Sequence, residues 1–259
     1  EDDPWVDSVI FSGDISLGYL EVFADDITVN DDVHINTGED DIYFRQRLIG
    51  VSTFENLSPV LVTDREVSVD IGMNAVLEGG SIYIVLQAED QSFSDVIGAN
   101  KEVSNFIIDP LTGLLENALA LPVKVLVKQS RAEITLQQGA QILGDGTVGL
   151  YATATADASG AAVSSLVSIG YVHADAEAIV DIQDGVVIEA GDAAVITATG
   201  SATASISSST TRELSSTPNP GSAQVALSIG VAYGTVTSHV TVAEGASITA
   251  GKTANVFAT

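Results

Sequence analysis

The stretch Ile134-Thr-Leu-Gln-Gln-Gly139-Ala-Gln-Ile-Leu-Gly-Asp-Gly146 returns twice with the same order of apolar, polar and glycine positions. The second copy is Val180-Asp-Ile-Gln-Asp-Gly185-Val-Val-Ile-Glu-Ala-Gly-Asp192, and the third is Val240-Thr-Val-Ala-Glu-Gly245-Ala-Ser-Ile-Thr-Ala-Gly-Lys252. Self-similarity of this kind is typical of a solenoid, in which each unit buries its apolar face by stacking on its neighbours.

Two independent markers give the spacing of the copies. Gly139 and Gly185 are 46 residues apart, whereas Gly185 and Gly245 are 60 apart. The tripeptide Ser-Ile-Gly at 168–170 and at 228–230 repeats the spacing of 60. The 14 extra residues equal the length of the segment 207–220, whose Ser, Thr and Pro content is typical of a loop. We therefore predict a 46-residue repeat with a loop insertion at 207–220.

Each copy predicts three short strands with glycine-containing turns between them. In the last copy these strands are 240–242, 246–249 and 254–258, about 20 residues in all. The other 26 residues of each repeat are expected to form a second, longer rung. Gly139, Gly185 and Gly245 occupy turn positions that favour positive φ. The expected fold is an all-β parallel β-helix, a rod of rungs about 4.8 Å apart with two rungs per repeat.

The first half of the chain carries weaker relatives of the same module, at 67–86 and at 27–38. Asp109 and Pro110, followed by apolar residues at helical spacing, predict one short helix near 110–120, with an ordered loop as the alternative. Residues 1–130 hold 24 of the 35 acidic residues. We therefore divide the chain into an acidic, less regular solenoid segment (1–130) and regular β-helix repeats (131–259).

Composition excludes several classes of partner. The chain has 259 residues, 46% of them hydrophobic, and 9 basic against 35 acidic residues give a net charge of −26. This charge argues against nucleic acid and anionic membranes as partners. No run of about 18 apolar residues predicts membrane insertion. The absence of cysteine excludes a disulfide framework and is compatible with export.

Acidic pairs in the first half are the candidate metal ligands. Carboxylates at the turns of stacked rungs can converge on Ca²⁺, which takes six to eight oxygen ligands. A solvated acidic face is the alternative, because neither the glycine-rich calcium nonapeptide nor the EF-hand spacing occurs. The candidate calcium ligands are Asp25, Asp26, Asp31, Asp32, Glu39, Asp40 and Asp41. No other cofactor is expected.

No catalytic motif is present in the sequence. The three histidines show no metal-ligand spacing. A site resembling that of pectate-cleaving lyases needs a basic residue beside clustered acids, for which the candidates are Arg45, Arg47 and Arg65. Arg45 and Arg47 are close in sequence to Asp40 and Asp41, and we expect structural ion pairs there. We predict no catalytic residue and no enzyme activity.

The repeat resembles the shaft of giant repetitive bacterial surface or secreted proteins of the filamentous-haemagglutinin type. The resemblance is carried by strand, Gly-Ala, Ile, Ala-Gly, strand and an Ala/Ser/Thr-rich run over 131–259. It implies a right-handed parallel β-helix, Gram-negative-type export to the cell surface or medium, and a structural or adhesive role. The implied partners are other cells, surface glycans or proteins, or copies of the chain end to end. The alternative function is a carbohydrate-active β-helix enzyme or a carbohydrate-binding module.

The last residues, 254–259, stop within a strand at a point where the earlier copy continues. Because a solenoid end exposes unpaired backbone groups, we expect either further rungs in a longer protein or end-to-end assembly.

Overall fold

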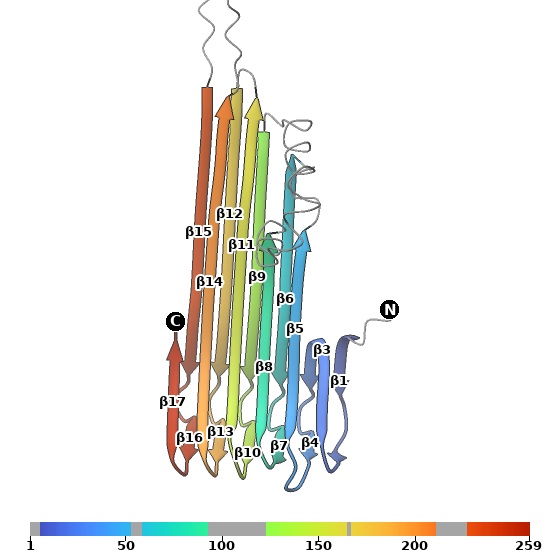
Figure 1. Ribbon diagram of the computed structural model, residues 1–259. Helices are drawn as coiled ribbons and strands as arrows, with labels where there is room; N and C mark the ends of the chain where they lie inside the picture. Colours follow the sequence, from blue (N-terminus) through green and yellow to red (C-terminus); the bar gives the residue numbers. More distant parts are fainter. Residues whose placement is uncertain (1–5, 53–58, 93–122, 165–166, 211–226) are drawn as a thin grey trace, which may run out of the picture.

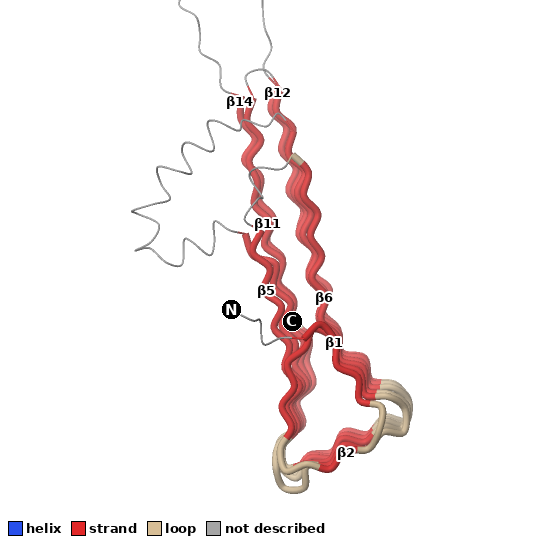
Figure 2. The backbone as a smooth tube through the Cα atoms, turned by 90° about the vertical axis from the view of Figure 1, so that its right-hand side faces the viewer, coloured by secondary structure: helices blue, strands red, loops and turns tan. Residues whose placement is uncertain are grey.

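The computed structural model describes residues 6–52, 59–92, 123–164, 167–210 and 227–259. The described chain is an all-β parallel β-helix, as predicted from the repeat, and all its strand pairings are parallel. The chain passes down one tall sheet, across a short basal sheet and up a second tall sheet (Figures 1 and 2). We name these sheets A, B and C.

Sheet A contains β1 (Val6–Phe11), the second half of β3 (Leu20–Val29), β6 (Val60–Ile71), β9 (Val123–Leu136), β12 (Val167–Ile182) and β15 (Leu227–Val242). Sheet B contains β2 (Ile15–Ser16), β4 (His34–Asn36), β7 (Val76–Gly79), β10 (Gln141–Gly144), β13 (Val187–Ala190) and β16 (Ser247–Ala250). Sheet C contains the first half of β3, β5 (Ile42–Ser52), β8 (Ile82–Ser92), β11 (Val148–Ser164), β14 (Ala193–Thr210) and β17 (Thr253–Ala258). Sheet B has one strand per rung, so the described residues form six rungs.

Each 46-residue repeat forms one rung, so the prediction of two rungs per repeat is wrong. Ile142 of β10 pairs directly with Ile188 of β13, 46 residues further on. The residues assigned to a second rung belong to the upper parts of the long strands β11 and β12. Inward and outward side chains alternate along these strands without turn residues, so one rung runs to the top of sheet C before the next descends.

Equivalent positions lie in register from rung to rung. In sheet B the central position forms a column of branched aliphatic side chains along the stack. The column is Ile15, Ile35, Leu77, Ile142, Ile188 and Ile248. The four middle members are completely buried. The modules recognised at 27–38 and 67–86 are therefore true rungs of the same solenoid, as predicted.

The turn from sheet A to sheet B has one left-handed residue in each of five rungs. Gly139, Gly185 and Gly245 have φ of 74°, 70° and 91°, which confirms the positive φ predicted for these turns. Asp32 and Asn74 occupy the same position in earlier rungs, with φ of 58° and 55°. Aspartate and asparagine tolerate this conformation better than other residues with a side chain.

The strands, and not the stack of rungs, set the longest dimension of the molecule (Figure 1). The molecule is therefore not the expected rod but a tall wedge that narrows away from sheet B (Figure 2). β14 has 18 residues, which at about 3.3 Å per residue extend for about 60 Å. Five spacings of about 4.8 Å between six rungs give roughly 24 Å along the stack.

The size of the inward side chains changes from the base to the top of the wedge. Near sheet B the core consists of large residues such as Phe44, Ile134 and Leu136, all completely buried. Higher up, alanines such as Ala154 and Ala176 face each other from sheets C and A. Because the alanine side chain is short, sheets A and C lie closer together there, as Figure 2 shows.

The division of the chain at residue 130 stays a prediction from composition, whereas the bounds predicted for the insertion differ from those in the structure. Residue 130 lies inside β9, so sheets A and C continue through the change in composition. Residues 207–210 belong to β14 and pair with residues 161–164 of β11, so the insertion starts later than predicted. It lies between Thr210 and Leu227, where the connector is 14 residues longer than the one between Ser164 and Val167. The helix expected near 110–120 lies outside the described residues.

Replacing Gly185 by alanine is expected to lower the free energy of unfolding by about 1 kcal/mol, because the left-handed region crowds a side chain against its own backbone. A Cβ at Gly185 would approach Gly139 backbone atoms no closer than 3.8 Å, so backbone strain sets this cost. Gly185→Asn should lose less, since Asn74 already occupies this position. Chemical denaturation of both variants measures the difference, and equal losses would contradict the explanation.

Replacing residues 211–226 by a two-residue connector should leave the fold intact and change stability little. The substitution gives the fifth and sixth rungs the 46-residue spacing, and the closure entropy of a loop depends weakly on its length. Far-ultraviolet circular dichroism and thermal unfolding test this expectation. Loss of the β-sheet signal would show that the insertion is required for folding.

Candidate functional site

Tyrosines stack on the outer face of sheet C. Tyr43 of β5 and Tyr83 of β8 are partners in register, with ring centroids 5.1 Å apart and planes inclined by 12°. Tyr19 lies next to Tyr43, at a centroid distance of 6.0 Å. The guanidinium carbon of Arg45 lies 4.6 Å from the centre of the Tyr43 ring. Stacked rings and a cation over a ring face are both favourable arrangements.

A shallow cleft of about 420 Å³ opens beside these tyrosines. We call it the tyrosine cleft; it is lined by Phe23, Tyr43, Arg45, Gln46, Arg47, Tyr83, Val85 and Gln87. Arg45 also pairs with Glu21, at 3.3 Å from Nε to Oε1. Arg47 is exposed and has no ion pair among the described residues, so its guanidinium can bind an anionic or hydroxyl-rich ligand.

The phenol of Tyr43 remains a neutral hydrogen-bond donor at ordinary pH. Burial raises its pKa, and so do the hydrogen bond to Asp41 and the charge of that carboxylate. The hydroxyl lies 3.0 Å from Asp41 Oδ2. Aromatic rings, arginines and amides on one concave surface suit recognition of a polar molecule that also has apolar faces, such as a sugar.

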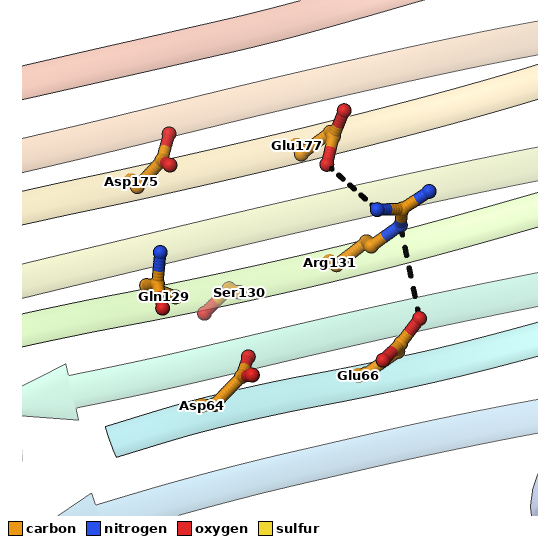
Figure 3. A pocket seen from close by; sticks show the side chains of 7 residues that line it. All are labelled: Asp64, Glu66, Gln129, Ser130, Arg131, Asp175 and Glu177. Atoms are coloured by element: carbon orange, nitrogen blue, oxygen red, sulfur yellow. Dashed lines mark ion pairs between the residues drawn. The ribbon is translucent and has the colours of Figure 1, made fainter. Parts of the chain in front are cut away.

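A second site lies on the outer face of sheet A, where Arg131 of β9 pairs with glutamates from three rungs. Figure 3 shows two of them, Glu66 and Glu177. The Arg131 guanidinium lies 2.7 Å from Glu133, 3.2 Å from Glu177 and 3.7 Å from Glu66. Glu66 and Glu177 are the residues in register with Arg131 on the two neighbouring strands. We call these four residues the Arg131 cluster.

The shallow hollow at this cluster has a volume of about 160 Å³ and is also lined by Asp64, Gln129, Ser130 and Asp175. Burial lowers the pKa of Arg131, but the hydrogen bond to Glu133 and the charges of Glu133, Glu177 and Glu66 outweigh it and raise the pKa overall. Arg131 therefore remains charged and cannot act as a general base. The ion pairs of the cluster join three rungs, and this arrangement fits a structural role better than a lyase site.

Of the basic residues singled out in the sequence, Arg45 forms a structural ion pair, but with a different partner from the one expected. Arg45 pairs with Glu21 on the neighbouring strand of sheet C, so the ion pairs expected with Asp40 and Asp41 are absent among the described residues. Arg131, whose partners Glu66 and Glu177 are 65 and 46 residues away, was missed. Only the register between rungs reveals this cluster, because Glu133 alone is near in sequence.

The proposed calcium ligands lie at three places in the second rung. Asp25 and Asp26 belong to β3, Asp31 and Asp32 to the turn between sheets A and B, and Glu39, Asp40 and Asp41 to the turn between sheets B and C. The two turns lie at opposite ends of sheet B, so the seven acids do not converge at one point (Figure 2).

Several of these carboxylates bind polar groups of the next rung. Asp26 accepts a hydrogen bond from Ser68 Oγ at 2.8 Å, Asp31 from the Met73 amide at 2.8 Å and Asp41 from the Ser81 amide at 2.8 Å. Among the described residues, no three acidic or histidine side chains are grouped as a metal site would require. Calcium binding stays a prediction, and the structure gives these acids a role in joining rungs.

Comparison with known protein families, with curated proteins and with solved structures finds no match to this chain. No helix among the described residues is long and apolar enough to cross a membrane.

Arg131→Ala is expected to lower the free energy of unfolding by about 1 kcal/mol, because three glutamates then face one another without a cation and all are partly exposed. The loss should shrink in high salt, which screens their repulsion. Arg131→Lys is the matched control: it retains the charge and should lose less. Denaturant unfolding at low and high ionic strength checks this, and an Arg131→Ala loss independent of salt would contradict it.

Proposed function

We propose that this chain is a structural and adhesive segment of a large extracellular bacterial protein, a β-helical shaft that contributes to attachment to cells or surfaces. The structural part is supported by the unbroken register of six rungs, which makes a stiff scaffold from backbone hydrogen bonds and a continuous core. The lack of cysteine and the acidic charge are compatible with an exported, soluble segment.

One observation supports the adhesive part: the upper outer face of sheet A carries exposed apolar side chains on four adjacent strands. We call this set the apolar field; it comprises Val60, Val62, Val123, Val167, Ile169, Tyr171, Leu227, Ile229, Val231 and Tyr233. Register places its members side by side, for example Ile169 between Val123 and Ile229. Contiguous exposed apolar surface of this kind is typical of an interaction site.

The double substitution Ile169→Ser with Ile229→Ser is expected to reduce attachment of protein-coated beads to cell monolayers. Both side chains are more than two-fifths exposed, so the fold should persist by circular dichroism. Ile10→Ser, a similar change at an exposed position of β1 outside the field, should leave attachment unchanged. Equal attachment of all three proteins, or no attachment by the unmodified protein, would contradict the adhesive proposal.

The tyrosine cleft favours a second candidate function, a carbohydrate-binding module. Calorimetry with acidic and neutral oligosaccharides should then detect binding that Arg47→Ala weakens and that Tyr171→Ala, on the opposite sheet, does not. A catalytic version of this function would also release new chain ends from the polysaccharide. Binding that is indifferent to Arg47 would remove the cleft as the site.

A further inference from the structure

A lysine and an aspartate face each other in the interior of the wedge. Lys128 of β9 and Asp90 of β8 both have side chains with no exposed surface. Lys128 comes from sheet A of the fourth rung and Asp90 from sheet C of the third, so the pair bridges opposite sheets of adjacent rungs. Lys128 Nζ lies 3.3 Å from Asp90 Oδ1.

Two neighbours of the pair in register are alanines. Ala174 is the neighbour of Lys128 in register on β12, and Ala156 is the neighbour of Asp90 on β11; both are completely buried. These small residues leave depth for the lysine side chain between the two sheets. Thr63 is the other neighbour of Lys128 in register, and its hydroxyl donates a hydrogen bond to Asp90 Oδ2.

The contact is not an aligned charge-assisted hydrogen bond. Such bonds have N–O distances of about 2.7–2.9 Å, shorter than the distance found here. Asp90 Oδ1 also lacks a hydrogen-bond partner among the described residues. Removing two opposite charges from water is costly unless excellent geometry repays it, so this arrangement is a poor final state for an ion pair.

We infer that Lys128 and Asp90 condense to an intramolecular amide, an isopeptide bond that joins sheet A to sheet C. Proton transfer from the ammonium to the carboxylate first gives a neutral amine and a neutral acid. The amine nitrogen then attacks Asp90 Cγ and forms the N–C bond. The nitrogen gives up one proton, a C–O bond breaks, and the oxygen leaves as water. No oxidant or external reagent is needed.

Three features of the structure favour this condensation. Cγ is bonded to the oxygen that Nζ touches, so the reacting atoms are held close to attacking distance by the fold. The Thr63 hydroxyl polarises the carboxyl group and provides a route for protons to Oδ2 as it departs. The product has no charge, which removes the cost of burying two ions. The inference does not depend on the proposed adhesive function.

Intact mass spectrometry of the denatured protein tests the bond directly. The measured mass should be one water molecule below the mass calculated from the sequence. Trypsin should leave Lys128 uncleaved and release peptide 125–131 joined to peptide 66–101. A succinimide at an aspartate would give the same mass loss without the joined peptides. A mass equal to the calculated one, or a digest without the joined pair, overturns the inference.

Substitutions assign the bond to its residues. Lys128→Met retains an unbranched apolar side chain and should restore the full calculated mass. Thr63→Val, which is nearly isosteric, should leave a mixture of linked and unlinked chains. Persistence of the mass loss in Lys128→Met would overturn the inference. Complete and equally fast linkage in Thr63→Val would overturn the role given to the Thr63 hydroxyl. If Lys128→Met fails to fold, the peptide map of the unmodified protein still decides.

Discussion

The structure depends on parallel pairing in register between rungs. This pairing places each side chain beside the equivalent residue of the rungs before and after it, about 4.8 Å away. A favourable contact can therefore recur along a column, as it does for the branched aliphatic column of sheet B and for Tyr43 and Tyr83 of sheet C. Side chains of like charge in such a column repel one another unless a side chain of opposite charge lies between them, as Arg131 lies between Glu66 and Glu177.

Register also explains why the same left-handed backbone conformation recurs at equivalent turns. A left-handed backbone in one rung requires the same conformation in the next if the hydrogen bonds on both sides are to be kept. The chain meets this requirement with glycine in the last three rungs and with Asp32 and Asn74 earlier. The side-chain amide of Asn74 donates a hydrogen bond to the carboxylate of Asp32. The residues that tolerate the left-handed conformation therefore also join neighbouring turns.

The size of the inward residues gives the wedge its shape. Large aliphatic residues keep the three sheets apart at the base, whereas alanine lets sheets A and C approach higher up. Polar interior residues that include Lys128, Asp90 and Ser130 lie in this narrower region, on strands of the third and fourth rungs. Ser130 donates to the carbonyl of Thr155 across the gap, so these residues link the two sheets where apolar contact area is small.

Much of the fold can be predicted from the sequence because the repeat consists of patterns among residues that are close in sequence. Alternation, turn glycines and the spacing of Gly139, Gly185 and Gly245 predict parallel stacking and the left-handed turns. The predicted number of rungs per repeat is wrong because a run of Ala, Ser and Val such as 150–164 fits the alternation of one long strand as well as that of two short strands. The Arg131 cluster and the Lys128–Asp90 pair were not predictable, since their members are distant in sequence and come from different strands.

Disulfide formation between introduced cysteines tests the one-rung repeat most directly, because the natural chain has no cysteine. Thr135 and Asp181 are partners in register on β9 and β12, and Thr241 is the next partner on β15. Cysteines at 135 and 181 would have Cα atoms about 4.8 Å apart, within disulfide range, whereas cysteines at 135 and 241 would be about twice as far apart. The account predicts rapid oxidation of the 135/181 pair in dilute monomer and none of the 135/241 pair. Failure of the 135/181 pair to close in the folded protein would contradict it.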